Sequence, residues 1–315
     1  MSLYLARRFV HAILVLFVVS VLTFALVNLA PGGPAIMTTM ETTVEQREAH
    51  RIRLGLDKPI HVRFGKWLLA TFRGDFGRSF NDGRPVLDVL GERLPPTLLL
   101  GAATLLVSLA AGVPIGVFSA THRYSSYDHT VTLLSFFGVS VPAFWLAIML
   151  ILLFSVELRW LPSSGIATIG APFSIMDRFQ HMIMPVVVLA TVTLPQLVRF
   201  TRSALLEVLS QDYVRTARAK GMREPRVLFR HALRNALIPV ATVLGLLIPR
   251  LLGGAVITET IFGWPGMGQL AVTSAIGRDY PLIMGVTVIV AAVVIAANLA
   301  VDLAYGWLDP RIRYE

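Results

Sequence analysis

The chain has 315 residues, of which 55% are hydrophobic and only 15% are charged. Because soluble domains carry about 25% charged residues, this composition indicates a protein whose solvent is the lipid bilayer. The formal net charge of +9 comes from basic residues in short segments between apolar runs. That arrangement argues against a nucleic-acid-binding face, so we expect membrane lipid and no nucleic acid among the partners.

Cysteine is absent, which excludes disulfides, cysteine-ligated zinc and iron–sulfur clusters built by this chain. The seven histidines show no ligand spacing such as His-Glu-x-x-His. The sequence also lacks the Gly-x-x-x-x-Gly-Lys-[Ser/Thr] loop that cradles nucleotide phosphates. We therefore expect no catalytic residues, no metal site, no cofactor and no ATP site in this chain.

Six apolar runs have about the 20-residue length that a helix needs to cross a bilayer. In chain order they are Phe9–Leu29, Leu98–Ala120, Val131–Val156, Met182–Phe200, Leu237–Ile257 and Leu282–Leu303. Pro142 and Pro195 fall inside runs, and membrane helices tolerate proline because neighbouring groups satisfy the freed carbonyl. The sequence therefore predicts an all-α polytopic membrane protein with about six transmembrane helices.

Residues 1–30 have one feature of a signal peptide, since Arg7 and Arg8 precede the first apolar run. The run is too long for a cleaved signal, and Ala30-Pro31 is a poor cleavage site. We expect residues 1–30 to form a retained N-terminal transmembrane helix.

Residues 31–96 make the first segment long enough to have its own structure. Glu41–Leu56 is typical of a surface helix closed by Gly55, and Ile60–Phe72 repeats apolar residues at helical spacing, as an interfacial helix does. Two interpretations of this extracytoplasmic segment fit the pattern equally. It is either a cap packed on the outer mouth or a docking surface for an external partner.

Basic residues concentrate in the segment 201–236, between the fourth and fifth runs. They are Arg202, Arg215, Arg218, Lys220, Arg223, Arg226, Arg230 and Arg234. Under the positive-inside rule this segment lies in the cytoplasm, together with both termini, because the tail 309–315 adds Arg311 and Arg313. Residues 97–308 then form a core of five transmembrane helices with 201–236 as its cytoplasmic loop.

Within this loop the stretch QDYVRTARAKG is typical of a short helix. One helical face carries small or apolar residues at i, i+3 and i+7: Val214, Ala217 and Gly221. Basic residues surround that face: Arg215, Arg218 and Lys220. Small residues would let the surface of another protein approach closely, and glycine can end the helix in a sharp turn. A loop that only sets topology is the alternative, although topology needs only a few charges.

Arg250 is the one strongly ionisable residue well inside a predicted span. A charge at the centre of a membrane helix costs about 2.5–3.5 kcal/mol on insertion scales, so the side chain is expected to face water or a partner. It is interpreted either as a residue of the substrate pathway that meets a carboxylate, or as a boundary arginine that pairs with Glu259.

The segment Phe262–Gly268 follows the fifth run on the outer side. Trp264, Pro265 and Gly266 lie at its centre, where glycine and proline impose a tight bend. A gate, a re-entrant turn and a plain connecting loop all fit this bend.

The loop resembles that of the inner-membrane permease subunits of binding-protein-dependent ABC importers. Their signature is Glu-Ala-Ala-x-x-x-Gly, then nine residues and Ile-x-Leu-Pro. Here Arg215-Thr216-Ala217 stands at the Glu-Ala-Ala positions and Gly221 at the glycine. His231-Ala232-Leu233-Arg234 stands at the Ile-x-Leu-Pro positions. The stretches DYVRTARAKG and HALRNALIP are similar to the dipeptide/oligopeptide/nickel branch of this family.

Further likenesses to that branch run in the same order along nearly the whole chain. They are Leu54–Pro59, Gly74–Gly77, Arg84–Val86, Gly138–Pro142, Trp160–Pro162, Phe262–Gly268 and Asp309–Tyr314. The resemblance implies the ABC type I importer permease fold in a bacterial inner membrane. It further implies a second homologous permease, two ATPase subunits that bind ATP and Mg, and an extracytoplasmic solute-binding protein.

The resemblance also assigns a role to the short helix as the element that couples the permease to the ATPases. Its residues would be Val214, Arg215, Thr216, Ala217, Arg218, Lys220 and Gly221. With arginine in place of the signature glutamate, Arg215 would need an acidic partner. The solute would be a peptide, nickel or another small solute.

An ion-coupled secondary transporter of a small solute is the alternative class. Such carriers need Asp, Glu or His within their spans for proton or sodium binding. None lies in the middle of a predicted span, so the sequence favours the importer permease.

Overall fold

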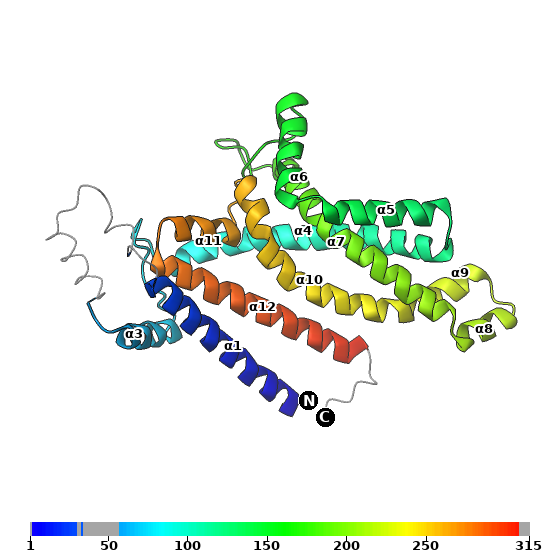
Figure 1. The fold of residues 1–315 in the computed structure, drawn as a ribbon, viewed down its shortest axis with the longest axis horizontal. Helices are drawn as coiled ribbons and strands as arrows, with labels where there is room; N and C mark the ends of the chain where they lie inside the picture. Colours follow the sequence, from blue (N-terminus) through cyan, green and yellow to red (C-terminus); the bar gives the residue numbers. More distant parts are fainter. Residues whose placement is uncertain (1, 30–32, 34–56, 309–315) are drawn as a thin grey trace. The chain divides into compact units, whose positions relative to one another are not determined.

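The computed structural model describes residues 2–29, 33 and 57–308, without the side chains of residues 2–6, 250, 252–254 and 302–308 (Figure 1). The helix predicted over Glu41–Leu56 and the tail 309–315 lie outside the described residues. The described part of the chain is built from helices, and its only bridge of β type joins Arg78 to Pro85. This agrees with the all-α class expected from the sequence.

The helices have the following bounds, with η marking π-helical segments. They are α1 (Ser2–Leu29), α3 (Ile60–Phe72), α4 (Val86–Thr121), α5 (Ser126–Ser140), α6 (Ala143–Leu150), η2 (Ile151–Glu157), α7 (Ile175–Leu209), α8 (Asp212–Ala219), α9 (Glu224–Arg226), η3 (Val227–Leu233), α10 (Arg234–Ile261), α11 (Met267–Ile276) and α12 (Tyr280–Leu308).

Among the described residues, five helices are long and apolar enough to cross a membrane, or six if one bent pair counts as a span. The bent pair joins α5 to α6–η2 at an angle of 96°. A single helix over Val131–Val156 was expected, and this detail is wrong. Pro142 disfavours helical angles at the preceding residue, and Val141 accordingly has extended backbone (φ −75°, ψ 124°). The other predicted spans each fall within a helix of the structure.

Contacts divide the chain into two compact units. Unit 1 comprises residues 1–97 and 265–295, and unit 2 comprises residues 98–264 and 296–315. The core of unit 1 is formed by the start of α4 with α11 and α12: Val86, Val89, Leu90, Met267, Leu270, Leu282 and Val286. Within the same unit α3 packs on α1, where the Phe24 and Phe64 rings lie 5.2 Å apart. The bounds predicted for α3 are confirmed.

Unit 2 is organised around α7, which packs against α5, α6 and α10 (Figure 1). Helix α4 approaches α7 closely because glycine occupies positions 112 and 116. A Cβ atom added at Gly116 would lie 2.7 Å from Thr201 Cβ, so a larger residue cannot fit at that crossing. Ser108 and Thr193 share a buried hydrogen bond of 2.6 Å between the same two helices.

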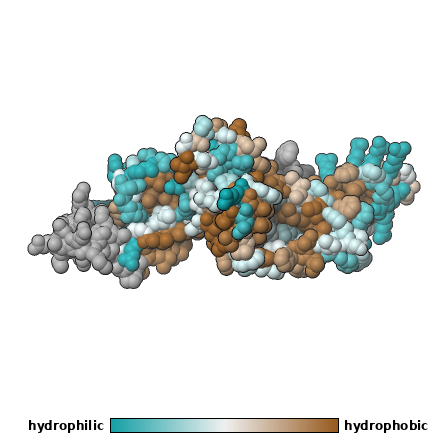
Figure 2. Space-filling view, turned by 90° about the horizontal axis from the view of Figure 1, so that it is seen from above, coloured by the Kyte–Doolittle hydropathy of each residue, from teal (hydrophilic) through white to brown (hydrophobic). Residues whose placement is uncertain are grey.

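Apolar side chains cover the outer surface of these helices. On α5, Leu133, Phe136 and Phe137 are all at least 60% exposed, as expected where lipid is the solvent. Figure 2 shows this hydrophobic surface beside a hydrophilic one at the end of unit 2 that carries α8 and α9. The segment 201–236 accordingly divides into helix ends and a short polar connection, since α7 continues to Leu209 and η3 begins at Val227.

Candidate functional site

The connection between α7 and α10 contains the predicted short helix, α8. Asp212 lies in its first turn and Arg218 in its last, so both charges complement the helix dipole. Gly221 ends the element with φ +75°, and its N–H donates to the Arg218 carbonyl at 2.9 Å. This left-handed ending is the one that glycine adopts without strain. The helix and its terminating glycine are therefore as expected.

The apolar face of α8 is turned toward its own chain. Val214 and Ala217 are buried against Val227, with Val208 and Leu209 of α7 beside them. We expected this face to meet another protein, and that expectation is wrong for these two side chains. A helix of about two turns cannot bury its apolar side chains alone, so they are buried on the ends of the neighbouring helices. The packing fixes α8 on the end of α7.

The exposed face of α8 is polar and basic. Arg215 lies 3.5 Å from Asp212 and both side chains are largely exposed, so this ion pair is weak. Arg218 donates to Glu224 at 2.8 Å, which ties the end of α8 to the start of α9. Three further cations are exposed and form no ion pair within the described part of the chain: Lys220, Arg223 and Arg226. The surface open to a partner is therefore positively charged.

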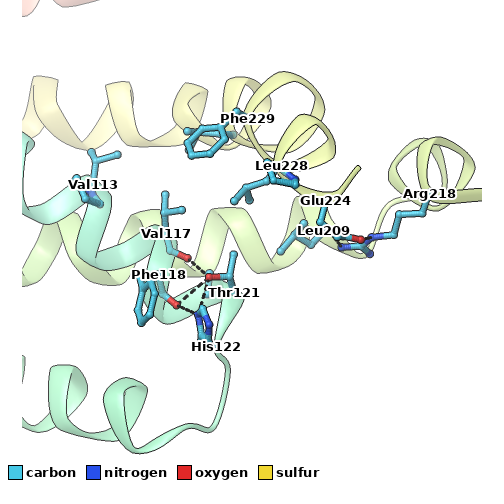
Figure 3. Close-up of a pocket in the computed structure, with 14 residues that line it drawn as sticks. Val113, Val117, Phe118, Thr121, His122, Leu209, Arg218, Glu224, Leu228 and Phe229 are labelled. Atoms are coloured by element: carbon cyan, nitrogen blue, oxygen red, sulfur yellow. Dashed lines mark hydrogen bonds and ion pairs between the residues drawn. The ribbon is translucent and has the colours of Figure 1, made fainter. Parts of the chain in front are cut away.

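A groove of about 630 Å³ runs beside this connection (Figure 3). One wall is the end of α4, with Val113, Val117 and Phe118, and the facing wall carries Leu228 and Phe229 of η3. The Arg218–Glu224 pair closes one end of the groove. Across the groove, α4 and the α8–α9 element are separated rather than packed together.

A buried charged cluster on the other side of α4 was missed by the sequence analysis. Asp128 of α5 is 3% exposed, and Arg202 of α7 donates to its two carboxylate oxygens from Nε and Nη2, each at 2.7 Å. Ser125 caps α5 and accepts from the N–H of Asp128, and Ser-x-x-Asp is a local pattern that sequence alone can show. The pairing with Arg202, 74 positions away, has no such signal.

Family models match the two parts of the chain. Residues 112–314 match the binding-protein-dependent transport system inner membrane component, and residues 1–101 match the N-terminal region of that system's membrane component. The chain belongs to this family. It is a multi-pass permease of an ABC importer, as the sequence resemblance implied.

Relatives match the permease over its whole length. It is 45% identical to the oligopeptide transport system permease protein AppB of Bacillus subtilis and 42% identical to the probable peptide ABC transporter permease protein y4tP of Sinorhizobium fredii, with all of each chain covered. In fold it is similar to a chain of the inward-facing MetNI methionine ABC transporter, with a TM-score of 0.59 and 19% identity. That likeness covers 71% of the permease and 97% of the other chain.

The bend predicted around Trp264, Pro265 and Gly266 separates α10 from α11 of the permease. Gly263 has φ +56°, and Trp264 is fully buried in the core of unit 2. The Phe262 carbonyl accepts from the N–H of Gly165 at 2.8 Å, which holds the bend to the loop before α7. A gating role for this bend stays a prediction.

Arg250 lies in α10, directly after Pro249. Its side chain is not among the described ones, so both interpretations of Arg250 stay open. Among the described residues of the permease, no group of three or more His, Cys, Asp or Glu side chains could hold a metal ion.

Proposed function

We propose that the permease forms half of the translocation pathway of a bacterial peptide importer and is driven through α8 by a partner ATPase. The observation that carries this proposal is α8 itself. It is a short helix fixed between two membrane helices by its buried face, while its basic face is open to another protein. Such an element can pass a displacement to α7 and α10 without bending.

The proposal includes the remaining parts of an importer. A second, homologous permease would complete the pathway, two ATPase subunits would bind ATP and Mg, and a soluble binding protein would deliver solute from outside. This permease would have no enzymatic activity of its own. Its N- and C-termini and α8 would lie in the cytoplasm, because the basic residues gather at that end of the spans.

Peptides are the proposed solute because the relatives named above are oligopeptide and peptide permeases. An ion-coupled secondary transporter, the alternative drawn from the sequence, finds no support in these relatives. The exposed cations of α8 suit an acidic groove on the ATPase, which fits arginine at position 215.

Cross-linking from α8 tests the ATPase contact, and the absence of natural cysteine makes an introduced thiol unique in this chain. Thr216→Cys places a thiol on the exposed face of α8, whereas Ile169→Cys places one on the loop before α7, where Ile169 is fully exposed. In membranes containing the intact importer, a short thiol–amine cross-linker should join position 216 to a chain that mass spectrometry identifies as a P-loop ATPase.

The same reagent at position 169 should yield no such product, since that loop lies on the opposite side of the membrane. A product of equal yield from both positions, or none from position 216 in an importer that hydrolyses ATP, would contradict the assignment of α8.

A further inference from the structure

Three segments of unit 2 meet at the carboxylate of Asp128. Arg202 of α7 donates a hydrogen bond to each of its oxygens, and Ser119 of α4 donates a further hydrogen bond to Oδ1. The N–H of Tyr124, in the turn between α4 and α5, donates to Oδ2 at 3.0 Å. The end of α4, the start of α5 and the last third of α7 are thus held at one point.

The hydrogen bonds of this cluster fix the relative orientation of three helices, which apolar packing alone would not do. A bidentate arginine–carboxylate pair fixes both distance and orientation, which a single hydrogen bond does not. Tyr124 has φ +63°, a left-handed conformation that a tyrosine rarely adopts and that the hydrogen bond to Asp128 helps to hold. Losing either charged partner would leave the other charge partly buried and unpaired.

The same stretch of α7 carries α8. Val208 and Leu209 at its end pack on Val214 and Ala217, and Ala204 and Leu205 pack with Ala120 of α4. The groove described above opens between α4 and the α9–η3 segment, while Ala232 of η3 packs in the same cluster as Ala120 of α4. Apolar packing thus joins this region to the end of α4, and the polar, oriented connection to the α4–α5 turn runs along α7 and through Arg202.

Helix α5 is the element that this connection would move. Its inner end is held by Asp128, and its outer end is the 96° break before α6. A helix that is held at one end and broken from the next helix at the other can change its tilt when the held end is displaced. Rigid helices joined by such breaks are typical of two-state transitions.

We propose that Asp128 and Arg202 are positioning residues that pass the displacement of α8 to the α4–α5 turn and so to the pathway. This inference rests on the proposed coupling function of α8. It goes beyond that function by assigning the transmission to one ion pair outside the coupling loop.

Arg202→Lys is the decisive variant. Lysine keeps the positive charge that neutralises Asp128 but cannot bind both oxygens in a fixed fork. Arg199→Lys is the matched control, because Arg199 lies one turn earlier on α7, is exposed and takes no part in the cluster. In the complete importer in liposomes, the quantity to measure is the ATP hydrolysed per solute molecule accumulated.

We expect Arg202→Lys to raise that ratio about fivefold or more, the size of a typical coupling between sites, with ATPase activity retained. Arg199→Lys should match the wild type. If the pair only stabilises the fold, hydrolysis and uptake will fall together and the ratio will stay at the wild-type value. That result would overturn the inference.

Ser119→Ala provides a milder test if Arg202→Lys fails to assemble. It removes only the hydrogen bond from α4, and we expect a ratio raised about twofold with the ion pair intact. An unchanged ratio in an assembled Ser119→Ala importer would count against the inference. Failure of the wild-type importer to couple uptake to ATP would instead contradict the proposed function, which keeps the two outcomes distinct.

Discussion

Gly221 is the residue that most directly fixes the shape of the connection between α7 and α10. Its φ of +75° lets the chain reverse after α8, and no atom lies within 4 Å of the position a Cβ would take. Any effect of a side chain at this position therefore comes from the backbone conformation and not from a clash. For L-residues, and above all for β-branched ones, the left-handed region is unfavourable by about 1–2 kcal/mol.

Gly221→Val should therefore distort the end of α8 and uncouple ATP hydrolysis from transport while leaving membrane insertion intact. Gly170→Val is the matched control, because Gly170 has φ +79° and equally open surroundings in the loop before α7. Uptake per ATP is the measurement. We expect a severalfold loss for the Gly221 variant alone, and equal behaviour of the two variants would contradict the role given to α8.

At the scale of elements, the crossing of α4 and α7 depends on two glycines four residues apart. Small residues at such a spacing let membrane helices approach closely enough to pack without a hydrophobic driving force. A Cβ added at Gly112 would meet Leu197, and one added at Gly116 would meet Val198 and Thr201, so α7 lies against the notch that the two glycines leave on α4. The notch positions α7 for the ion pair with Asp128.

Gly116→Val should destabilise the permease, because its Cβ would lie 2.7 Å from Thr201 Cβ and 2.8 Å from the Val198 carbonyl oxygen. Overpacking of this kind costs about 1–3 kcal/mol. Gly101→Val on the same helix, with nothing within 4 Å, is the control. Thermal unfolding in detergent should show a lowered midpoint for Gly116→Val only. A similar midpoint in both variants would mean that α4 and α7 do not approach as closely as described.

The sequence predicted the helices whose bounds depend only on neighbouring residues. Helix α3 has its predicted bounds, because apolar spacing and flanking residues define it. The chain turns after α8 at Gly221, because glycine adopts the left-handed conformation without strain. The direction of the apolar face of α8 was not predictable in this way. Helical spacing places Val214 and Ala217 on one face, but which surface covers that face depends on the ends of α7 and η3.

Features that depend on contacts between distant parts of the chain were also not predictable from the sequence. The sequence predicts a tolerated proline inside one span at Pro142, since proline alone does not distinguish a slight kink from the 96° break of the structure. The pair of Asp128 and Arg202 joins positions far apart, and each residue taken alone is typical of a cytoplasmic helix end. Packing of α5 on α7 brings the two together, and that packing is a property of the folded chain.

At the scale of the whole molecule, the apolar surface and the basic connection from α7 to α10 face different surroundings. The exposed hydrophobic side chains of α1, α4 and α5 suit a bilayer, and five or six helical segments of the described residues are long and apolar enough to cross it. The charged surface gathers on the connection from α7 to α10, where a soluble partner can reach it. The proposed function assigns the supply of energy to partner subunits.

The dependence of uptake on ATP tests that central claim most directly. The purified importer would be reconstituted in liposomes with its second permease, ATPases and binding protein, and uptake of a labelled oligopeptide would be followed. The account predicts uptake with ATP on the side of α8, none with a non-hydrolysable analogue, and no change when an ionophore collapses ion gradients. Uptake that persists without ATP and stops with the ionophore would contradict it.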